Sequence, residues 1–73
     1  MMILIFYTGI SDELSKAFIS PLLNLLVGNG NWSVDLDDCD KVLRVEYSND
    51  ISDKIVHTLH ACGFDCTPVP VVL

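Results

Sequence analysis

Three cysteines are the residues whose type and spacing best suit metal or redox chemistry. Cys62 and Cys66 form a Cys-x-x-x-Cys pair, and Cys39 lies upstream in an acidic stretch. Paired thiolates select soft cations such as Cu(I), so these three residues are the candidate metal ligands. Cys62 also falls on an apolar helical stripe, where a free cysteine acts as a small buried hydrophobic side chain. We favour this packing interpretation and expect no metal and no cofactor.

The other polar clusters lack the parts of a complete site. His57 and His60 are three residues apart on a predicted helix, but zinc takes four ligands, and Cys62 lies about 200° around that helix from His60. Residues 35–46 have the acidic spacing of a calcium loop, yet Asp40 stands at the sixth position, where such a loop requires glycine. No nucleophile is paired with an oriented base. We therefore expect no enzymatic activity and no catalytic residues.

Charge and composition narrow the classes of partner. The 73 residues are 51% apolar, with a net charge of −6 and only four scattered basic residues. Nucleic-acid binding needs clustered cations, and anionic membrane surfaces are disfavoured for the same reason. The apolar residues 1–7 lack the features of a signal peptide, and the odd number of cysteines argues against disulfides. We expect one cytoplasmic domain over residues 1–73 that binds neither nucleic acid nor membrane.

The first half of the chain predicts a strand and a helix. Residues 2–7 are a continuous apolar run typical of a central strand. A helix is predicted over residues 11–26, with Ser11 as its N-cap. We favour a single helix kinked at Pro21 over a restart with Ser20 as a new cap. Its predicted buried stripe has three- and four-residue steps: Leu14, Phe18, Leu22 and Leu25, with Ala17 and Leu26 beside them.

A hairpin is predicted next, because apolar and polar residues alternate over 32–36 and again over 41–47 around a turn at 37–40. In the second of these strands the apolar residues share one face: Leu43, Val45 and Tyr47.

The last third predicts a second helix and an edge strand. Ser52 is the expected N-cap, and Gly63 is the expected left-handed residue after the helix. The buried stripe of this helix is expected from its spacing: Ile55, Val56, Leu59 and Cys62. The tail, residues 65–73, contains Pro68 and Pro70, and proline cannot donate to a sheet ladder.

The element order is therefore βαββαβ. In the split-βαβ arrangement the first and third strands are central and the fourth lies at an edge, which fits the prolines of the tail. We predict an α+β, ferredoxin-like fold, in which a four-stranded antiparallel sheet has both helices on one face. The strand at 2–7 is apolar on both sides. An apolar patch on the open sheet face would mark an interaction surface.

With these elements placed, the sequence resembles the heavy-metal-associated domain family of copper and mercury chaperones. The resemblance covers most of the chain and rests mainly on Val34-Asp35-Leu36, Val45-Glu46-Tyr47, Ile51, Ile55, Leu59 and Gly63-Phe64. It implies the same fold. The family binds metal through Met-x-Cys-x-x-Cys after the first strand, but the loop here has no cysteine, reading Tyr7-Thr8-Gly9-Ile10-Ser11-Asp12-Glu13-Leu14. The resemblance is thus to a degenerate form, and no family ligand transfers to this chain.

Three functions stay open on the sequence alone. We favour a non-enzymatic interaction module that forms a homodimer or binds a protein partner through the open sheet face or the acidic hairpin. The first alternative is a copper or zinc carrier that uses Cys62 and Cys66, with Cys39 as a further ligand. The second is a small-molecule regulatory domain with a ligand pocket, often at a dimer interface.

Overall fold

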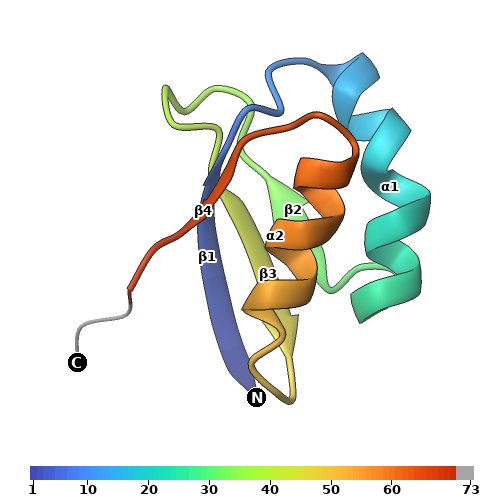
Figure 1. Ribbon diagram of the computed structural model, residues 1–73, viewed down its shortest axis with the longest axis vertical. Helices are drawn as coiled ribbons and strands as arrows, with labels where there is room; N and C mark the ends of the chain where they lie inside the picture. Colours follow the sequence, from blue (N-terminus) through green and yellow to red (C-terminus); the bar gives the residue numbers. More distant parts are fainter. Residues whose placement is uncertain (71–73) are drawn as a thin grey trace.

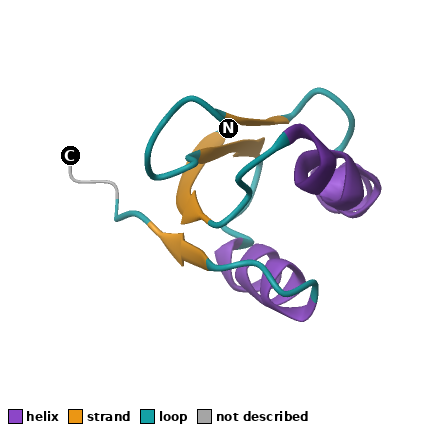
Figure 2. Cartoon of the chain, turned by 90° about the horizontal axis from the view of Figure 1, so that it is seen from above, coloured by secondary structure: helices purple, strands orange, loops and turns teal. Residues whose placement is uncertain are grey.

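The computed structural model describes residues 1–70. Along the chain it contains β1 (Met2–Thr8), α1 (Glu13–Val27), β2 (Trp32–Val34), β3 (Leu43–Tyr47), α2 (Ser52–Ala61) and β4 (Cys66–Pro68). The strands form one antiparallel sheet in the order β2-β3-β1-β4. Both helices cover the same side of this sheet (Figures 1 and 2). The predicted α+β, ferredoxin-like fold is confirmed, with β1 and β3 in the centre and β4 at an edge.

The hydrophobic core lies between the sheet and the two helices. Leu4 and Phe6 of β1 stand opposite Val45 and Leu43 of β3 in the antiparallel register. All four side chains are buried, as the alternation along the predicted strand at 41–47 indicates for Leu43 and Val45. The helices close the core with Ile19, Leu23, Val27, Ile55 and Leu59. Ile10, in the loop after β1, is also fully buried, although no periodic pattern includes it.

Helix α1 begins one residue later than its predicted cap. Asp12, not Ser11, is the N-cap, and its carboxylate accepts the Ser15 N–H at 2.7 Å. That hydrogen bond lowers the pKa of Asp12. The prediction failed because two neighbouring residues are both good caps. Here Asp12 has the extended backbone that a cap requires, with φ −150° and ψ 172°.

Pro21 lies inside one continuous helix. The prediction of a single helix is therefore confirmed, and a restart at Ser20 is wrong. The Ser20 hydroxyl instead donates to the Lys16 carbonyl at 2.8 Å. Proline has no N–H, so the carbonyl four residues earlier, that of Ala17, loses its helical donor. Both Ala17 and Pro21 are exposed, so water can satisfy that carbonyl.

The predicted buried stripe of α1 is wrong at most of its positions, although Leu22 and Leu26 are half-buried. Leu14, Phe18 and Leu25 are 81%, 63% and 85% exposed, whereas the buried residues of the helix are Ile19, Leu23 and Val27. The helix has two apolar stripes on opposite sides, and only one can face the sheet. Pro21 shares the side of Leu14, Phe18 and Leu25 at 100° per residue. The carbonyl that Pro21 leaves unpaired needs hydration, which favours turning that side outward.

The hairpin strands are shorter than predicted. Strands expected at 32–36 and 41–47 are only Trp32–Val34 and Leu43–Tyr47, so residues 35–42 form the connection. Within it the Asp37 N–H donates to the Asp35 carboxylate at 3.1 Å, and the Asp40 N–H donates to the Asp38 carboxylate at 2.8 Å. These bonds shape the turn, whereas the second strand cannot begin at Lys41, because that residue has φ +49°, outside the extended region of a strand.

Helix α2 differs from the prediction at its N-terminus and agrees with it at its C-terminus. Ser52 does not cap it; instead its N–H and hydroxyl both donate to the Asp50 carboxylate, at 3.0 and 2.6 Å. Gly63 has φ +88°, and the Phe64 N–H donates to the Leu59 carbonyl at 2.9 Å, which is the predicted left-handed ending. Ile55 and Leu59 are buried, whereas Val56 and Cys62 of the predicted stripe are half-buried.

Strand β4 pairs with only part of β1. Its register matches residues 66–68 with Thr8, Tyr7 and Phe6, and the Val69 N–H donates to the Ile5 carbonyl at 2.8 Å. The rest of the predicted tail strand, Val71, Val72 and Leu73, lies outside the described residues. Within residues 1–70 no helix has the length and apolar character needed to cross a membrane.

Candidate functional site

The sheet face opposite the helices is the main candidate surface, and we call it the open face. Its centre is Ile3, Ile5 and Tyr7 of β1, which alternate with the core residues of that strand. Ile3 is 44% and Tyr7 46% exposed, and Ile5 is half-buried. Register adds cross-strand neighbours on the same face: Ser33, Arg44, Glu46 and Thr67. The apolar patch expected on β1 is therefore present.

An ion pair borders this apolar centre. Arg44 and Glu46, two residues apart on β3, are joined by a 3.0 Å contact between Nη1 and Oε1. Both side chains stay partly exposed, at 48% and 34%, so the pair itself adds at most about 1 kcal/mol of stability. Among residues 1–70 it is the one ion pair. The two residues give the face one cation and one anion beside its apolar residues.

A groove of about 400 Å³ continues the open face along the edge of β1. It forms where β4 no longer covers that strand, and its apolar walls include Ile3, Ile5 and Val69. Its polar side chains are Asp50 and Ser52, which hydrogen-bond to each other. Hydrogen bonds from Ser52 lower the pKa of Asp50. These hydrogen bonds use the Ser52 donors and the Oδ1 atom of Asp50, and most of the groove lining is apolar, so the groove mainly extends the apolar surface.

The three cysteines lie in different surroundings. Cys39 is exposed on the hairpin connection, Cys62 is half-buried at the end of α2, and Cys66 is buried in β4. Burial raises the pKa of the Cys66 thiol to about 11. The structure does not gather Cys39, Cys62 and Cys66 into one cluster. His57 is exposed, as is His60, and neither belongs to a metal-ligating group in the described part of the chain.

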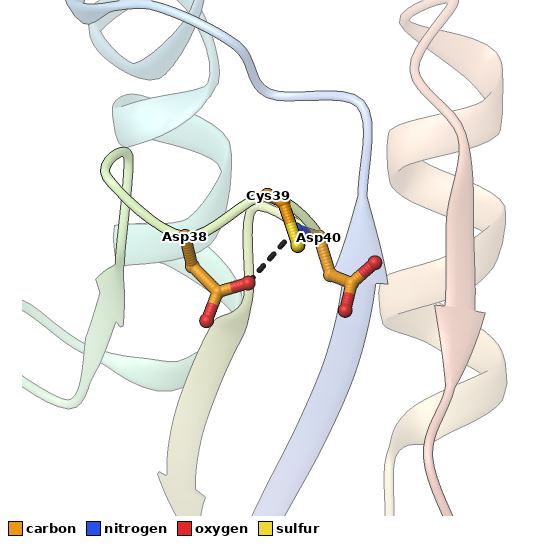
Figure 3. Close-up of side chains that lie close together, drawn as sticks. All are labelled: Asp38, Cys39 and Asp40. Carbon is orange, nitrogen blue, oxygen red and sulfur yellow. Dashed lines mark hydrogen bonds between the residues drawn. The ribbon is translucent and has the colours of Figure 1, made fainter.

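Cys39 instead lies between two aspartates. The ligand atoms of Asp38, Cys39 and Asp40 come within 4.8 Å of one another, and Figure 3 shows the hydrogen bond from the Asp40 backbone N–H to the Asp38 carboxylate. The cluster mixes one soft thiol with two hard carboxylates, which prefer different metals. The Thr8 N–H donates a hydrogen bond to the Asp40 carbonyl at 3.1 Å. These contacts account for the hairpin shape without a ligand.

The outward side of α1 is a second apolar surface, and periodicity alone assigned it to the core. We call it the α1 face: Leu14, Phe18, Pro21 and Leu25. The ring of Phe18 lies 6.4 Å from that of Phe64, so the surface extends toward the end of α2. The signal that could have found it is Pro21, which marks the solvated side of the helix.

Comparisons with models of protein families, with curated proteins and with solved structures found no significant match. The resemblance to the heavy-metal-associated family therefore rests on the residue pattern and stays a prediction.

Proposed function

We propose that this chain is a non-enzymatic interaction module, and that its open face binds a second copy of the chain. The observation that carries the proposal is the row of Ile3, Ile5 and Tyr7, which lies on a sheet face that no helix covers. Removing apolar surface from water drives association, and a contiguous exposed apolar patch is typical of an interaction site.

The charges on the open face favour a second copy over an unrelated partner. In a twofold dimer each surface meets itself, so a residue contacts its complement on the other subunit. Arg44 and Glu46 have opposite charges and lie next to each other. Rotation of one copy can therefore set Arg44 against Glu46 of the second copy. A face with one cation and one anion is complementary to itself, despite the net charge of −6.

The size of the molecule limits the area of this contact. The chain measures 32 × 25 × 21 Å, so any one side spans roughly 500 to 800 Å². A standard stable interface buries about 800 Å² on each partner. The sheet face reaches that area only if most of it takes part. An interface near or below that area suits a reversible dimer, and we propose a dissociation constant in the micromolar range, about 8 kcal/mol of binding free energy.

Cys66 weighs against the metal-carrier alternative. A thiol must lose its proton to bind metal, and burial raises the pKa of this one to about 11. The small-molecule alternative would use the groove beside β1, whose lining is mostly apolar and whose Ser52 donors already bind Asp50.

Three free thiols fit a reducing compartment, so we propose that the module is located in the cytoplasm.

Sedimentation equilibrium of the wild type and two lysine variants tests the proposal. The wild-type mass should rise with concentration toward twice the 8.1 kDa of one chain. Ile3→Lys puts a charge in the centre of the open face and should leave a monomer. Leu25→Lys puts the same charge on the α1 face, where the residue is 85% exposed, and should still dimerise. A wild type that stays monomeric throughout contradicts the proposal.

A further inference from the structure

The turn between α1 and β2 contains an asparagine followed by a glycine. Asn29 and Gly30 are both exposed, and Gly30 has φ +86°. In such a pair the backbone nitrogen of the glycine can attack the side-chain amide carbon of the asparagine, because glycine has no Cβ to obstruct the approach. A Cβ added at Gly30 would have open space around it. The turn therefore leaves the two reacting groups accessible to each other and to water.

No hydrogen bond among residues 1–70 restrains the reacting groups. Within that range the Asn29 side-chain amide has no partner, and neither has the Gly30 N–H. The loop is held by the next residue instead, because the Asn31 side-chain amide donates to the Val27 carbonyl at 2.7 Å. Ring closure between Asn29 and Gly30 thus breaks no hydrogen bond of the described chain.

The other three asparagines of the chain lack this combination. The Asn24 side-chain oxygen accepts the Trp32 Nε1–H at 2.7 Å, and the Asn31 amide is bound to a helix carbonyl. Asn49 is exposed, but Asp50 follows it, and the Cβ of that residue crowds its backbone nitrogen. The structure therefore singles out Asn29.

We propose that Asn29 is a site of spontaneous deamidation. The Gly30 nitrogen forms a bond to Cγ of Asn29, the bond from Cγ to Nδ2 breaks, and the Gly30 amide proton leaves with that nitrogen as ammonia. Water then opens the cyclic succinimide at either of its carbonyls. One opening gives aspartate. The other gives isoaspartate, in which the main chain runs through the side chain of residue 29 and is longer by a methylene group.

The isoaspartate product loosens the end of the sheet at β2. The Asn31 carbonyl accepts the Glu46 N–H at 2.7 Å, and its own N–H donates to the Gly28 carbonyl at 3.3 Å. A longer main chain between Gly28 and Asn31 cannot keep both of these hydrogen bonds in place. Gly30 also lines a small hollow together with Arg44 and Glu46, so the disturbed strand borders the open face.

Peptide mapping by mass spectrometry of the incubated full-length protein tests the site. The wild type should convert at Asn29 at least about tenfold faster than at Asn49, with release of ammonia. The rate should rise with pH, because the Gly30 nitrogen must lose its proton to attack. Asn29→Gln, which would need a larger ring, should stay unmodified at this position. Equal rates at Asn29 and Asn49 would overturn the assignment.

A synthetic peptide of residues 26–34 separates the effect of the folded turn from that of the dipeptide. The folded protein should react at a rate within about tenfold of the peptide, and a protein that stays intact after the peptide has reacted fully would overturn the proposal. Hydrogen exchange measures the consequence for β2. The Glu46 N–H should exchange faster in the isoaspartate fraction than in the unreacted protein, and equal exchange would contradict the loosening.

Discussion

Cys66 shows how burial decides what a thiol can do. In the sequence it pairs with Cys62 as a possible metal or redox site, but in the structure it is 4% exposed and belongs to the core. A thiol with its pKa raised to about 11 keeps its proton at neutral pH, and the thiol is far less nucleophilic than the thiolate. Its contribution is therefore to packing, as a small hydrophobic side chain.

We predict that Cys66 makes stability fall at high pH. An unfolded thiol loses its proton near the ordinary pKa of 9.0, whereas the folded one keeps it to about 11. Between these values the folded state binds more protons, so the free energy of unfolding decreases as pH rises, by roughly 3 kcal/mol in all. Urea unfolding of wild type and Cys66→Ala from about pH 7 to 11 measures this. The two proteins should converge as pH rises, and a constant difference would contradict the prediction.

We predict that the reduced protein binds neither Cu(I) nor Zn(II) stoichiometrically against a competing chelator. Native mass spectrometry detects bound metal directly, and Cys62→Ser with Cys66→Ser should leave the spectrum unchanged. Tight binding that this double variant abolishes would support the carrier alternative instead. Binding lost only in Cys39→Ser would assign the metal to the hairpin cluster with Asp38 and Asp40.

At the scale of the element, α1 has two apolar sides that sequence spacing does not rank. One stripe includes Leu14 and Leu25, and the opposite one includes Ile19 and Leu23. Periodicity finds both, but the choice between them depends on which side can tolerate water. Pro21 makes that choice, because the carbonyl freed by its missing N–H needs a solvent partner.

We predict a large loss of stability from one leucine substitution in α1 and almost no change from another two residues away. Leu23→Ala removes a fully buried side chain and should lower the free energy of unfolding by about 2 to 5 kcal/mol. Leu25→Ala changes a residue that is 85% exposed and should change stability by less than about 0.5 kcal/mol. Thermal and urea denaturation of both variants measures the difference. Similar losses in the two variants would mean that the assigned faces of α1 are wrong.

The elements themselves follow from local patterns in the sequence. The apolar run of β1, the alternation in β3 and the glycine at position 63 predict features that the structure has. The helical spacing predicts α2, although only Ile55 and Leu59 of its expected stripe are buried. The strand lengths in the hairpin differ from the prediction, because Lys41 has φ +49° and so cannot belong to an extended strand. Ile10 could not be predicted as core, since a loop residue has no period. Its burial depends on how the loop folds over the helices.

The sequence predicts one of the two candidate surfaces and not the other. The open face was predictable, because an apolar run on both sides of β1 must leave one side uncovered when both helices lie on the other. The contact between Arg44 and Glu46 follows only from side-chain positions. The α1 face could not be predicted without knowing which stripe the sheet receives.

At the scale of the whole molecule, two apolar surfaces face in opposite directions. The open face lies on one side of the sheet, and the α1 face lies on the far side of the helix layer. A dimer packed sheet to sheet would leave both α1 faces at its outer ends.

Isotope-filtered NOE spectroscopy on a mixture of ¹³C-labelled and unlabelled protein tests the central claim most directly, because it reports only contacts between copies. The account predicts intermolecular NOEs among the methyl groups of Ile3 and Ile5 and the ring of Tyr7. Intermolecular NOEs confined to Leu14, Phe18 and Leu25 would place the dimer on the α1 face and contradict it. A complete absence of intermolecular NOEs, at concentrations well above micromolar, would contradict self-association through either surface.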